Sequence, residues 1–229
     1  MSLSNTSLYK RTLRRLFESR VPCENNYGIA YEIIGYSEIF KPVGVIDGTS
    51  LEYIEHELDW YNSQDLNING HKGIENNKVW KKCATEDGHV NSNYGWCIFS
   101  KENGEQFENA VKAIVSDINT KQACMYYTRP SIHKEFNDGI HARRDMICTC
   151  YTSTLLRCGV LHHNVHMRSN DVWYGLRNDL AWQQHVAEKM VDRLRSEGLL
   201  IYNTIIHWFA DSLHLYERNV MDARKMIEE

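Results

Sequence analysis

The sequence has little proline and no long apolar run. It contains three prolines in 229 residues, too few for a proline-rich linker, which favours one continuous domain over residues 1–229. Its apolar stretches, such as residues 199–202, are far shorter than the roughly 20 residues that cross a bilayer. Residues 1–20 are basic but have no apolar core, so no secretory signal is visible. We therefore expect a cytoplasmic protein that does not enter a membrane.

An excess of basic residues is also missing. The 26 lysines and arginines against 30 acidic residues give a formal net charge of −4. DNA binding requires a cationic surface that this balance does not provide, so no DNA binding is expected. A small anionic ligand needs only a few local cations and stays possible. Hydrophobic residues make up 42% of the chain and charged residues 24%, which excludes a disordered chain.

Seven cysteines, an odd number, indicate reduced thiols of a cytoplasmic protein. Cys148 and Cys150 form a Cys-x-Cys pair, with His162, His163 and His166 following. A metal site is a weak interpretation, because no second cysteine pair stands at zinc-finger spacing. The simpler interpretation is that these cysteines and histidines are ordinary strand residues. A third is a nucleophilic cysteine whose thiolate is stabilised by a nearby arginine. The candidate arginines are Arg143, Arg144, Arg157 and Arg168.

Hydrophobic spacing predicts helices and strands in an irregular order. Helices are expected over residues 6–20, 49–62, 107–118, 178–195 and 213–227. Strands are expected over 29–34, 123–128, 146–157, 160–167 and 199–209, with a tight connection at 157–160 and a polar loop over 62–77. Thr49 or Ser50 is expected to cap the second helix. Because strands and helices do not alternate regularly, we predict an α+β fold with one mixed or antiparallel sheet covered by helices.

Residues 167–179 gather polar side chains between a predicted strand and a predicted helix. Such a position suits the binding of an anion and the recognition of a ring. The alternative is that Asn178 or Asp179 simply caps the helix that follows. Composition alone favours the cap.

Several motifs, in this order along the chain, resemble the thymidylate synthase superfamily. They are Glu57-Leu-Asp-Trp60, Val79-Trp80, Asn91-Ser-Asn-Tyr-Gly-Trp96, Tyr127-Thr-Arg-Pro-Ser131, Cys148, the segment 168–179, and His214-Leu-Tyr216. Within the superfamily the chain is most similar to the deoxycytidylate (dCMP) hydroxymethylases of T-even bacteriophages. The resemblance covers most of the chain, from about Ile29 to about Arg218.

The resemblance implies a homodimer with a nucleotide pocket in each subunit. It implies that 5,10-methylenetetrahydrofolate gives its one-carbon unit to carbon 5 of a pyrimidine nucleotide. The thiolate of Cys148 would attack ring carbon 6 and so activate carbon 5. Loss of tetrahydrofolate would leave an exocyclic methylene, to which a hydroxymethylase adds water and a synthase adds hydride.

The resemblance also implies roles for single residues. Glu57 would be the general acid/base, whereas the alternative is an exposed helix carboxylate. Arg168 would contact both the phosphate and the nucleophile, Ser169 the phosphate, and Asn170 the substrate.

Further implied roles concern the sugar and the folate. His214 and Tyr216 would hold the sugar 3′-hydroxyl, although without the resemblance they would be interface or core residues. Asp171 would lie near the folate. Trp80 and Tyr94 would form pocket walls, with Trp80 stacking on the folate; core packing is the alternative for both aromatics.

The position that selects the base carries Asp179, where thymidylate synthases carry Asn. A carboxylate accepts from the cytosine amine, whereas uracil would place an acceptor against an acceptor. The sequence differs from the thymidylate synthases at two further places. Thr149 follows the nucleophile where synthases have His, and the family's adjacent arginine pair aligns with Lys121-Gln122, so that Lys121 keeps a charge but not the bidentate fork.

The predicted enzyme is therefore a dCMP 5-hydroxymethyltransferase, acting in the host cytoplasm if it is viral. A CMP hydroxymethylase and a dCMP methyltransferase are alternatives within the class. A relative that binds nucleotide or RNA without catalysis is the alternative outside it, and the four residues Cys148, Glu57, Arg168 and Asp179 argue against it.

Overall fold

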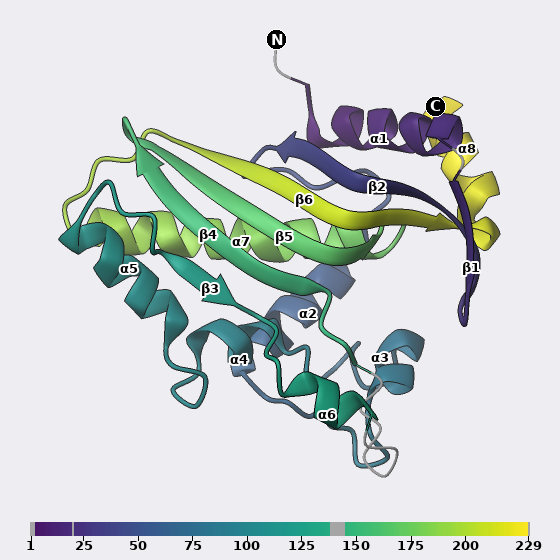
Figure 1. The fold of residues 1–229 in the computed structure, drawn as a ribbon, viewed down its shortest axis with the longest axis horizontal. Helices are drawn as coiled ribbons and strands as arrows, with labels where there is room; N and C mark the ends of the chain where they lie inside the picture. Colours follow the sequence, from purple (N-terminus) through teal and green to yellow (C-terminus); the bar gives the residue numbers. More distant parts are fainter. Residues whose placement is uncertain (1–2, 20, 138–144, 229) are drawn as a thin grey trace. The chain divides into compact units, whose positions relative to one another are not determined.

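The computed structural model describes residues 3–19, 21–137 and 145–228. The chain forms two compact units, which are described one by one (Figure 1). The first unit contains residues 1–49 and 154–229, and the second contains residues 50–153. Among the described residues, no helix is long and apolar enough to cross a membrane.

The described strands form one six-stranded sheet in the order β1-β2-β6-β5-β4-β3. The strands are β1 (Val21–Asn25), β2 (Gly28–Phe40), β3 (Cys124–Tyr126), β4 (Thr149–Arg157), β5 (Val160–Asp171) and β6 (Asn203–Tyr216). β5 and β6 run parallel, whereas β1 with β2, β2 with β6 and β3 with β4 run antiparallel. The sheet is therefore mixed, which confirms the predicted α+β class.

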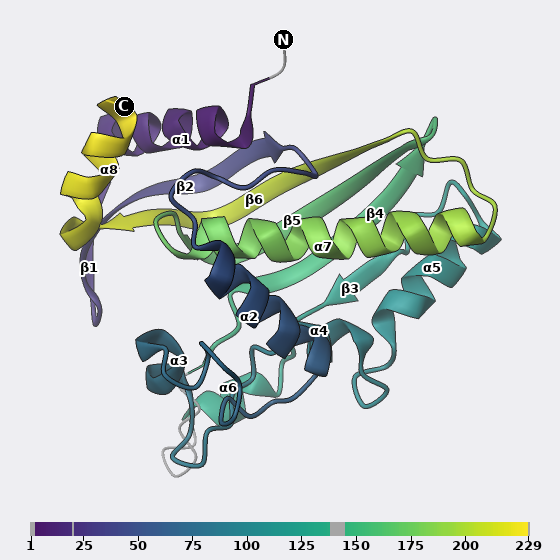
Figure 2. The ribbon, with the colours of Figure 1, turned by 180° about the vertical axis from the view of Figure 1, so that it is seen from behind.

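In the first unit, helices cover one face of the sheet. These helices are α1 (Asn5–Ser19) and α7 (Gly175–Ser196), and α8 (Val220–Glu228) follows the short 3-10 turn η1 (Glu217–Asn219). α7 crosses β5 and β6 in both ribbon views, and α1 lies along β2 (Figures 1 and 2). Ile206 and Trp208 of β6 and Val165 of β5 are fully buried beneath the helices. The strands alternate between covered and open positions, as a sheet with one covered face requires.

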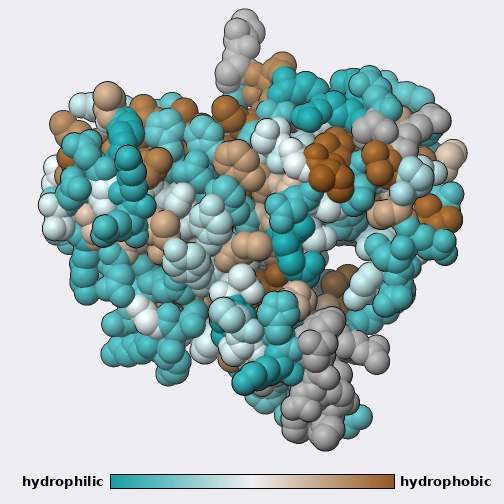
Figure 3. All heavy atoms as spheres, viewed as in Figure 1, coloured by the Kyte–Doolittle hydropathy of each residue, from teal (hydrophilic) through white to brown (hydrophobic). Residues whose placement is uncertain are grey.

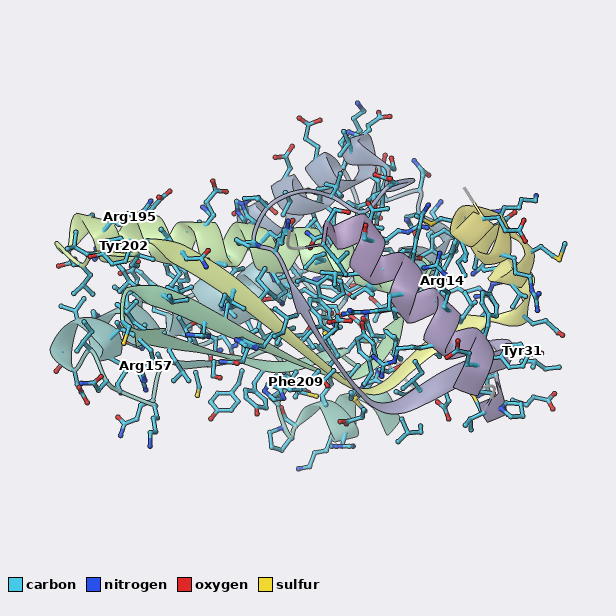
Figure 4. The ribbon with its side chains drawn as sticks, turned by 90° about the horizontal axis from the view of Figure 1, so that it is seen from above. Arg14, Tyr31, Arg157, Arg195, Tyr202 and Phe209 are labelled. Atoms are coloured by element: carbon cyan, nitrogen blue, oxygen red, sulfur yellow. The ribbon has the colours of Figure 1, made fainter. Side chains whose placement is uncertain are left out.

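The predicted tight connection between β4 and β5 is present. Cys158 and Gly159 both have positive φ angles, 48° and 74°, which glycine adopts without strain. A side chain at Gly159 would also clash with the ring of Tyr202, whose N–H donates to the Gly159 carbonyl at 2.8 Å. Figure 4 places Arg157, Arg195 and Tyr202 together at this end of the sheet.

In the second unit, helices surround an aromatic core. They are α2 (Leu51–Ser63), α3 (Lys78–Cys83), α4 (Tyr94–Phe99), α5 (Gln106–Ser116) and α6 (Ile132–Asn137). Ser50 caps α2 by accepting from the N–H of Tyr53, so the predicted cap is confirmed. Gly95 lies directly against the backbone carbonyl of Tyr61. Only glycine fits there, and this close approach brings α2 and α4 together.

The three largest boundary errors are the end of β2, the end of β6 and the start of α8. β2 does not stop at Gly35 but passes through it to Phe40. Residues 213–216, expected to begin the last helix, are the end of β6, and α8 begins only at Val220. Residues 213–216 are buried throughout, and a strand covered on both sides gives an apolar run that periodicity cannot distinguish from a helix.

Candidate active site

Glu57 lies on α2 and is buried in the second unit. The hydroxyl of Tyr53, one turn earlier, donates to its Oε1 at 2.8 Å. Nε1 of Trp80 in turn donates to the Tyr53 hydroxyl at 2.9 Å. Burial raises the pKa of Glu57 to about 7, and the hydrogen bonding of Tyr53 and Trp80 opposes this rise. The alternative of an exposed helix carboxylate is wrong, and a carboxyl with this pKa gives and takes protons readily near neutral pH.

The two aromatics predicted as pocket walls lie in different surroundings. Trp80 is half-buried, with its indole edge-on to Trp60 at a centroid distance of 4.8 Å. Tyr94 is buried and stacks on Tyr61 at 5.1 Å, with Tyr127 edge-on to it at 5.2 Å. Core packing therefore accounts for Tyr94. The folate-binding roles of both aromatics stay predictions.

Cys148 directly precedes β4 and is half-buried, with its Sγ 3.9 Å from the carbonyl of Met146. Three residues earlier, the buried carboxylate of Asp145 accepts from the backbone N–H groups of Asn91 and Ser92 at 2.8 and 2.7 Å, and from the Ser92 hydroxyl at 2.6 Å. Arg129 donates to the side-chain oxygen of Asn91 at 3.1 Å. Two of the recognised motifs thus hold the approach to the cysteine.

Other candidates near the cysteine are placed as follows. Cys150 lies within β4, two residues beyond Cys148. Lys121 is exposed between α5 and β3. Arg143 and Arg144 lie outside the described residues.

In the first unit, α7 begins at Gly175, with Tyr174 at the cap position and no side-chain cap. Asp179 therefore lies inside the helix, and the interpretation of Asn178 or Asp179 as a cap is wrong. Oδ2 of Asp179 instead accepts from Nδ2 of Asn170 at 2.8 Å. A Cβ at Gly175 would lie 3.2 Å from this amide nitrogen and 3.3 Å from the carboxylate oxygen. Glycine at this position makes room for the pair.

Asn170 itself is 2% exposed. Its Oδ1 is buried and finds no hydrogen-bond partner among the described residues. Buried polar atoms normally have a partner, so an acceptor without one beside a carboxylate is available to a donor from outside the chain.

Asp171 and His214 face each other across β5 and β6, at paired register positions. Burial raises the pKa of Asp171 and lowers the pKa of His214, and the attraction between the two groups opposes both shifts. Tyr216 lies edge-on to His214 at 5.1 Å, and the guanidinium of Arg218 covers the Tyr216 ring at 4.1 Å. These polar side chains gather where the two parallel strands end.

Arg168 and Ser169 precede Asn170 on β5. Arg168 is exposed and Ser169 is half-buried. The structure thus places five consecutive or paired candidates, 168–171 and His214, along one end of β5 and β6.

The three histidines of β5 do not converge. His163 is buried beneath α7, 2.9 Å from Gln183 and 3.3 Å from Thr154. His162 and His166 lie on the opposite face of the sheet, where they stack on His207 and Phe209. Within residues 3–19, 21–137 and 145–228, no group of three or more His, Cys, Asp or Glu is placed to hold a metal.

Similarity to known proteins identifies the family of the chain. The thymidylate synthase family model matches residues 42–229. The chain belongs to the thymidylate synthase family. It is 37% identical over 191 residues to the deoxycytidylate 5-hydroxymethyltransferases of Enterobacteria phages T4, T2 and T6, and the aligned region covers 82% of this chain and 76% of each relative. This thymidylate synthase relative is therefore a transferase of the family, directed at carbon 5 of a pyrimidine.

Two residues that contact the candidate site, Tyr53 and Asp145, were not predicted from the sequence. The sequence signal for Tyr53 is its position four residues before Glu57, which places both side chains on one helix face. Asp145 has no such signal, because its partners Asn91 and Ser92 lie more than fifty residues away.

Proposed function

We propose that the enzyme converts dCMP to 5-hydroxymethyl-dCMP, with methylenetetrahydrofolate as the one-carbon donor and water as the final nucleophile. The observation that carries this proposal is the Asp179 carboxylate, held at 2.8 Å by the amide of Asn170. It stands at the position where thymidylate synthases carry an amide. The names of the phage relatives support the same substrate.

Asp179 and Asn170 together offer acceptors to the base. Carboxylate oxygens accept only, and the buried Oδ1 of Asn170 is a further acceptor without a partner among the described residues. The exocyclic amine of cytosine donates two hydrogens, which match this pair. The carbonyl of uracil would meet acceptors, and each unpaired buried polar group costs about 1–3 kcal/mol.

Cys148 acts as the nucleophile in this proposal. Its thiolate forms a bond to ring carbon 6, and the electrons of the carbon 5–carbon 6 double bond move to make carbon 5 nucleophilic. Methylenetetrahydrofolate supplies the one-carbon unit that carbon 5 attacks. Carbon 5 would then give up its proton and tetrahydrofolate would leave, which gives an exocyclic methylene to which water adds. At the end, the sulfur–carbon bond breaks, the ring double bond returns and the thiolate leaves. The anchoring of Asp145 by Asn91 and Ser92 holds the backbone that leads to this cysteine.

Glu57 moves protons in the same cycle. A carboxyl with a pKa of about 7 exists in both forms near neutral pH, so it accepts a proton from the water that adds to the exocyclic methylene. Tyr53 and Trp80 position it through their hydrogen bonds. We assign the remaining candidates to binding. Arg168, Ser169 and Lys121 serve the phosphate, His214 and Tyr216 the sugar, and Asp171, Trp80 and Tyr94 the folate.

A homodimer is part of the proposal. In the first unit, the sheet face opposite α7 carries half-exposed rings and aliphatic side chains, among them Ile39, Ile205, His207 and Phe209. Figure 3 shows a mixture of apolar and polar side chains on this side, and Figure 4 places Phe209 on the side away from α7. A second copy would cover this face. Analytical ultracentrifugation should give a dimer for the wild type and a monomer for Phe209→Asp.

In the deciding experiment, the protein is incubated with methylenetetrahydrofolate and each of dCMP, CMP and dUMP, and the masses of the products are measured by mass spectrometry. We expect dCMP to gain CH2O. A gain of CH2 would indicate a dCMP methyltransferase, and preference for CMP an enzyme of ribonucleotides. Binding without turnover would indicate a nucleotide- or RNA-binding relative. Because the relatives are phage proteins, we expect the reaction to take place in the cytoplasm of an infected cell.

A further inference from the structure

The first unit contains a cavity that none of the proposed catalytic or nucleotide-binding residues lines. It lies between α1, the turn at residues 47–48, the start of α7 and α8. Its volume is about 330 Å³, at the small end of the range for ligand sites. The lining residues are Lys10, Asp47, Gly48, Trp173, Arg177, Asp222, Lys225 and Met226.

Arg177 is a buried cation in this cavity. Its side chain is held between the rings of Trp173 and Tyr9, with the guanidinium carbon 4.2 and 5.0 Å from the two centroids. One terminal nitrogen donates to the Gly48 carbonyl at 3.2 Å, and the other lies 3.2 Å from the sulfur of Met226. A carbonyl and a thioether do not neutralise a charge, so these contacts position the guanidinium without pairing it.

No carboxylate of the described chain pairs with this cation. Arg177 is 9% exposed, its Nε–H is buried without an acceptor among the described residues, and no described carboxylate lies within ion-pair distance of it. It is also the third residue of α7, where the helix dipole disfavours a positive charge. Buried charges are normally paired because leaving them unpaired is costly. The missing partner is an anion.

The other charges of the cavity determine how much negative charge fits. Lys225 pairs with Asp222 at 3.5 Å, and the lining holds one further lysine, Lys10, and one further aspartate, Asp47, whose formal charges cancel. One positive charge, that of Arg177, is left over. A single carboxylate matches it and its planar fork, whereas a phosphate dianion would meet Asp47 and Asp222. We propose that the cavity binds a small molecule through one carboxylate group, which pairs with Arg177 and whose body lies beside Trp173 and Met226.

The test uses benzoate as the carboxylate, benzamide as its neutral isostere and phenyl phosphate as the dianion, in calorimetric titrations of the full-length protein at pH 8. We expect benzoate to bind and benzamide not to bind, with phenyl phosphate weaker than benzoate. Arg177→Met removes the partner and should weaken benzoate binding by at least about tenfold.

A second variant keeps the test decisive if Arg177→Met fails to fold. Asp47 is exposed, so Asp47→Asn leaves the packing unchanged and removes one negative charge from the wall. It should strengthen benzoate binding about two- to fivefold and phenyl phosphate binding more. The matched control is Asp192→Asn, an exposed position roughly four turns further along α7, which should change nothing.

Three results would overturn the proposal. They are equal binding of benzoate and benzamide, benzoate binding that is absent at millimolar concentration, and benzoate binding that responds to neither Arg177→Met nor Asp47→Asn. Phenyl phosphate that binds the wild type more tightly than benzoate would overturn the choice of a carboxylate. The outcome does not depend on the proposed reaction, because none of these measurements uses nucleotide or folate.

Discussion

The hydroxyl of Tyr53 donates to the carboxylate of Glu57 across one turn of α2, at 2.8 Å. This bond stabilises the ionised carboxylate, whereas burial favours the protonated one, and the pKa of about 7 is the balance between the two. Because Tyr53 receives the indole N–H of Trp80, its hydroxyl hydrogen is directed at Glu57. Tyr53 is therefore a positioning residue for the proposed acid/base.

Tyr53→Phe should raise the pKa of Glu57 further. A hydrogen bond worth about 1 kcal/mol corresponds to roughly 0.7 of a pKa unit. If ionised Glu57 is the base, the acidic limb of the pH profile of kcat/KM moves toward higher pH by about that amount. Tyr126→Phe, at an exposed tyrosine of the same unit, should leave the profile in place. An acidic limb that stays where it was in Tyr53→Phe would show that the bond does not tune Glu57.

Glu57→Gln should abolish turnover and yet stabilise the fold at alkaline pH. The folded pKa of Glu57 is about 7 against 4.5 for the ordinary group, so the unfolded chain releases its proton first as the pH rises. The wild type thus loses stability between pH 4.5 and about 7, by about 3 kcal/mol for a fully buried group. The glutamine variant has no such proton to release.

Urea denaturation at pH 4.5 and pH 8 measures this difference. The free energies of unfolding of the wild type and Glu57→Gln should be similar at the lower pH, with the variant more stable at the higher pH. Glu55→Gln, at an exposed position of α2, serves as the control. Equal stability of wild type and Glu57→Gln at both pH values would contradict the raised pKa, and unaltered turnover would contradict the role.

Much of the fold could be predicted because its long elements have strong patterns. The predictions for α1, α2 and α5 lie within about two residues of the observed bounds. Shorter helices were not predicted. α3, α4 and α6 have six residues each, which is fewer than two turns, so no hydrophobic periodicity develops. β1 escaped because it is an edge strand whose residues are mostly exposed and include Pro22, which reads as a loop.

The candidate site was predictable only through its motifs. Composition alone favoured Asn178 or Asp179 as a helix cap, and the error arose because α7 already begins at Gly175. A glycine at a helix start reads as part of a loop, although here it makes room for the pair of Asn170 and Asp179. The orphaned oxygen of Asn170 has no trace in sequence, since it depends on tertiary packing.

Cys148→Ser should abolish both product formation and the release of tritium from 5-tritiated dCMP. Tritium release needs only activation of carbon 5, so it reports the covalent step even where water addition is slow. Cys150→Ser is the matched control, two residues away on β4 and half-buried like Cys148, and it should retain both activities. The opposite pattern would move the nucleophile to Cys150.

Asp179→Asn should move the base preference from dCMP toward dUMP. The change is nearly isosteric, and Gly175 leaves the space around the side chain unaltered, so the fold should survive. An amide presents a donor to the uracil carbonyl and an acceptor to its ring N–H, whereas the carboxylate presents acceptors only. One mismatch removed and one bond gained shift the ratio of the two kcat/KM values by roughly 10–100-fold.

Asn170 sharpens this last experiment. In Asp179→Asn, the amide of Asn170 can still donate to the side-chain oxygen at position 179. Asn170→Ala removes this donor from the wild type but leaves the Asp179 carboxylate in place. It should therefore weaken the discrimination between dCMP and dUMP without reversing it. Asp192→Asn, an exposed aspartate of the same helix, should leave the ratio unchanged. A wild-type enzyme that prefers dUMP, or a ratio that Asp179→Asn does not alter, would mean that the bond between Asn170 and Asp179 serves packing of α7 rather than choice of the base.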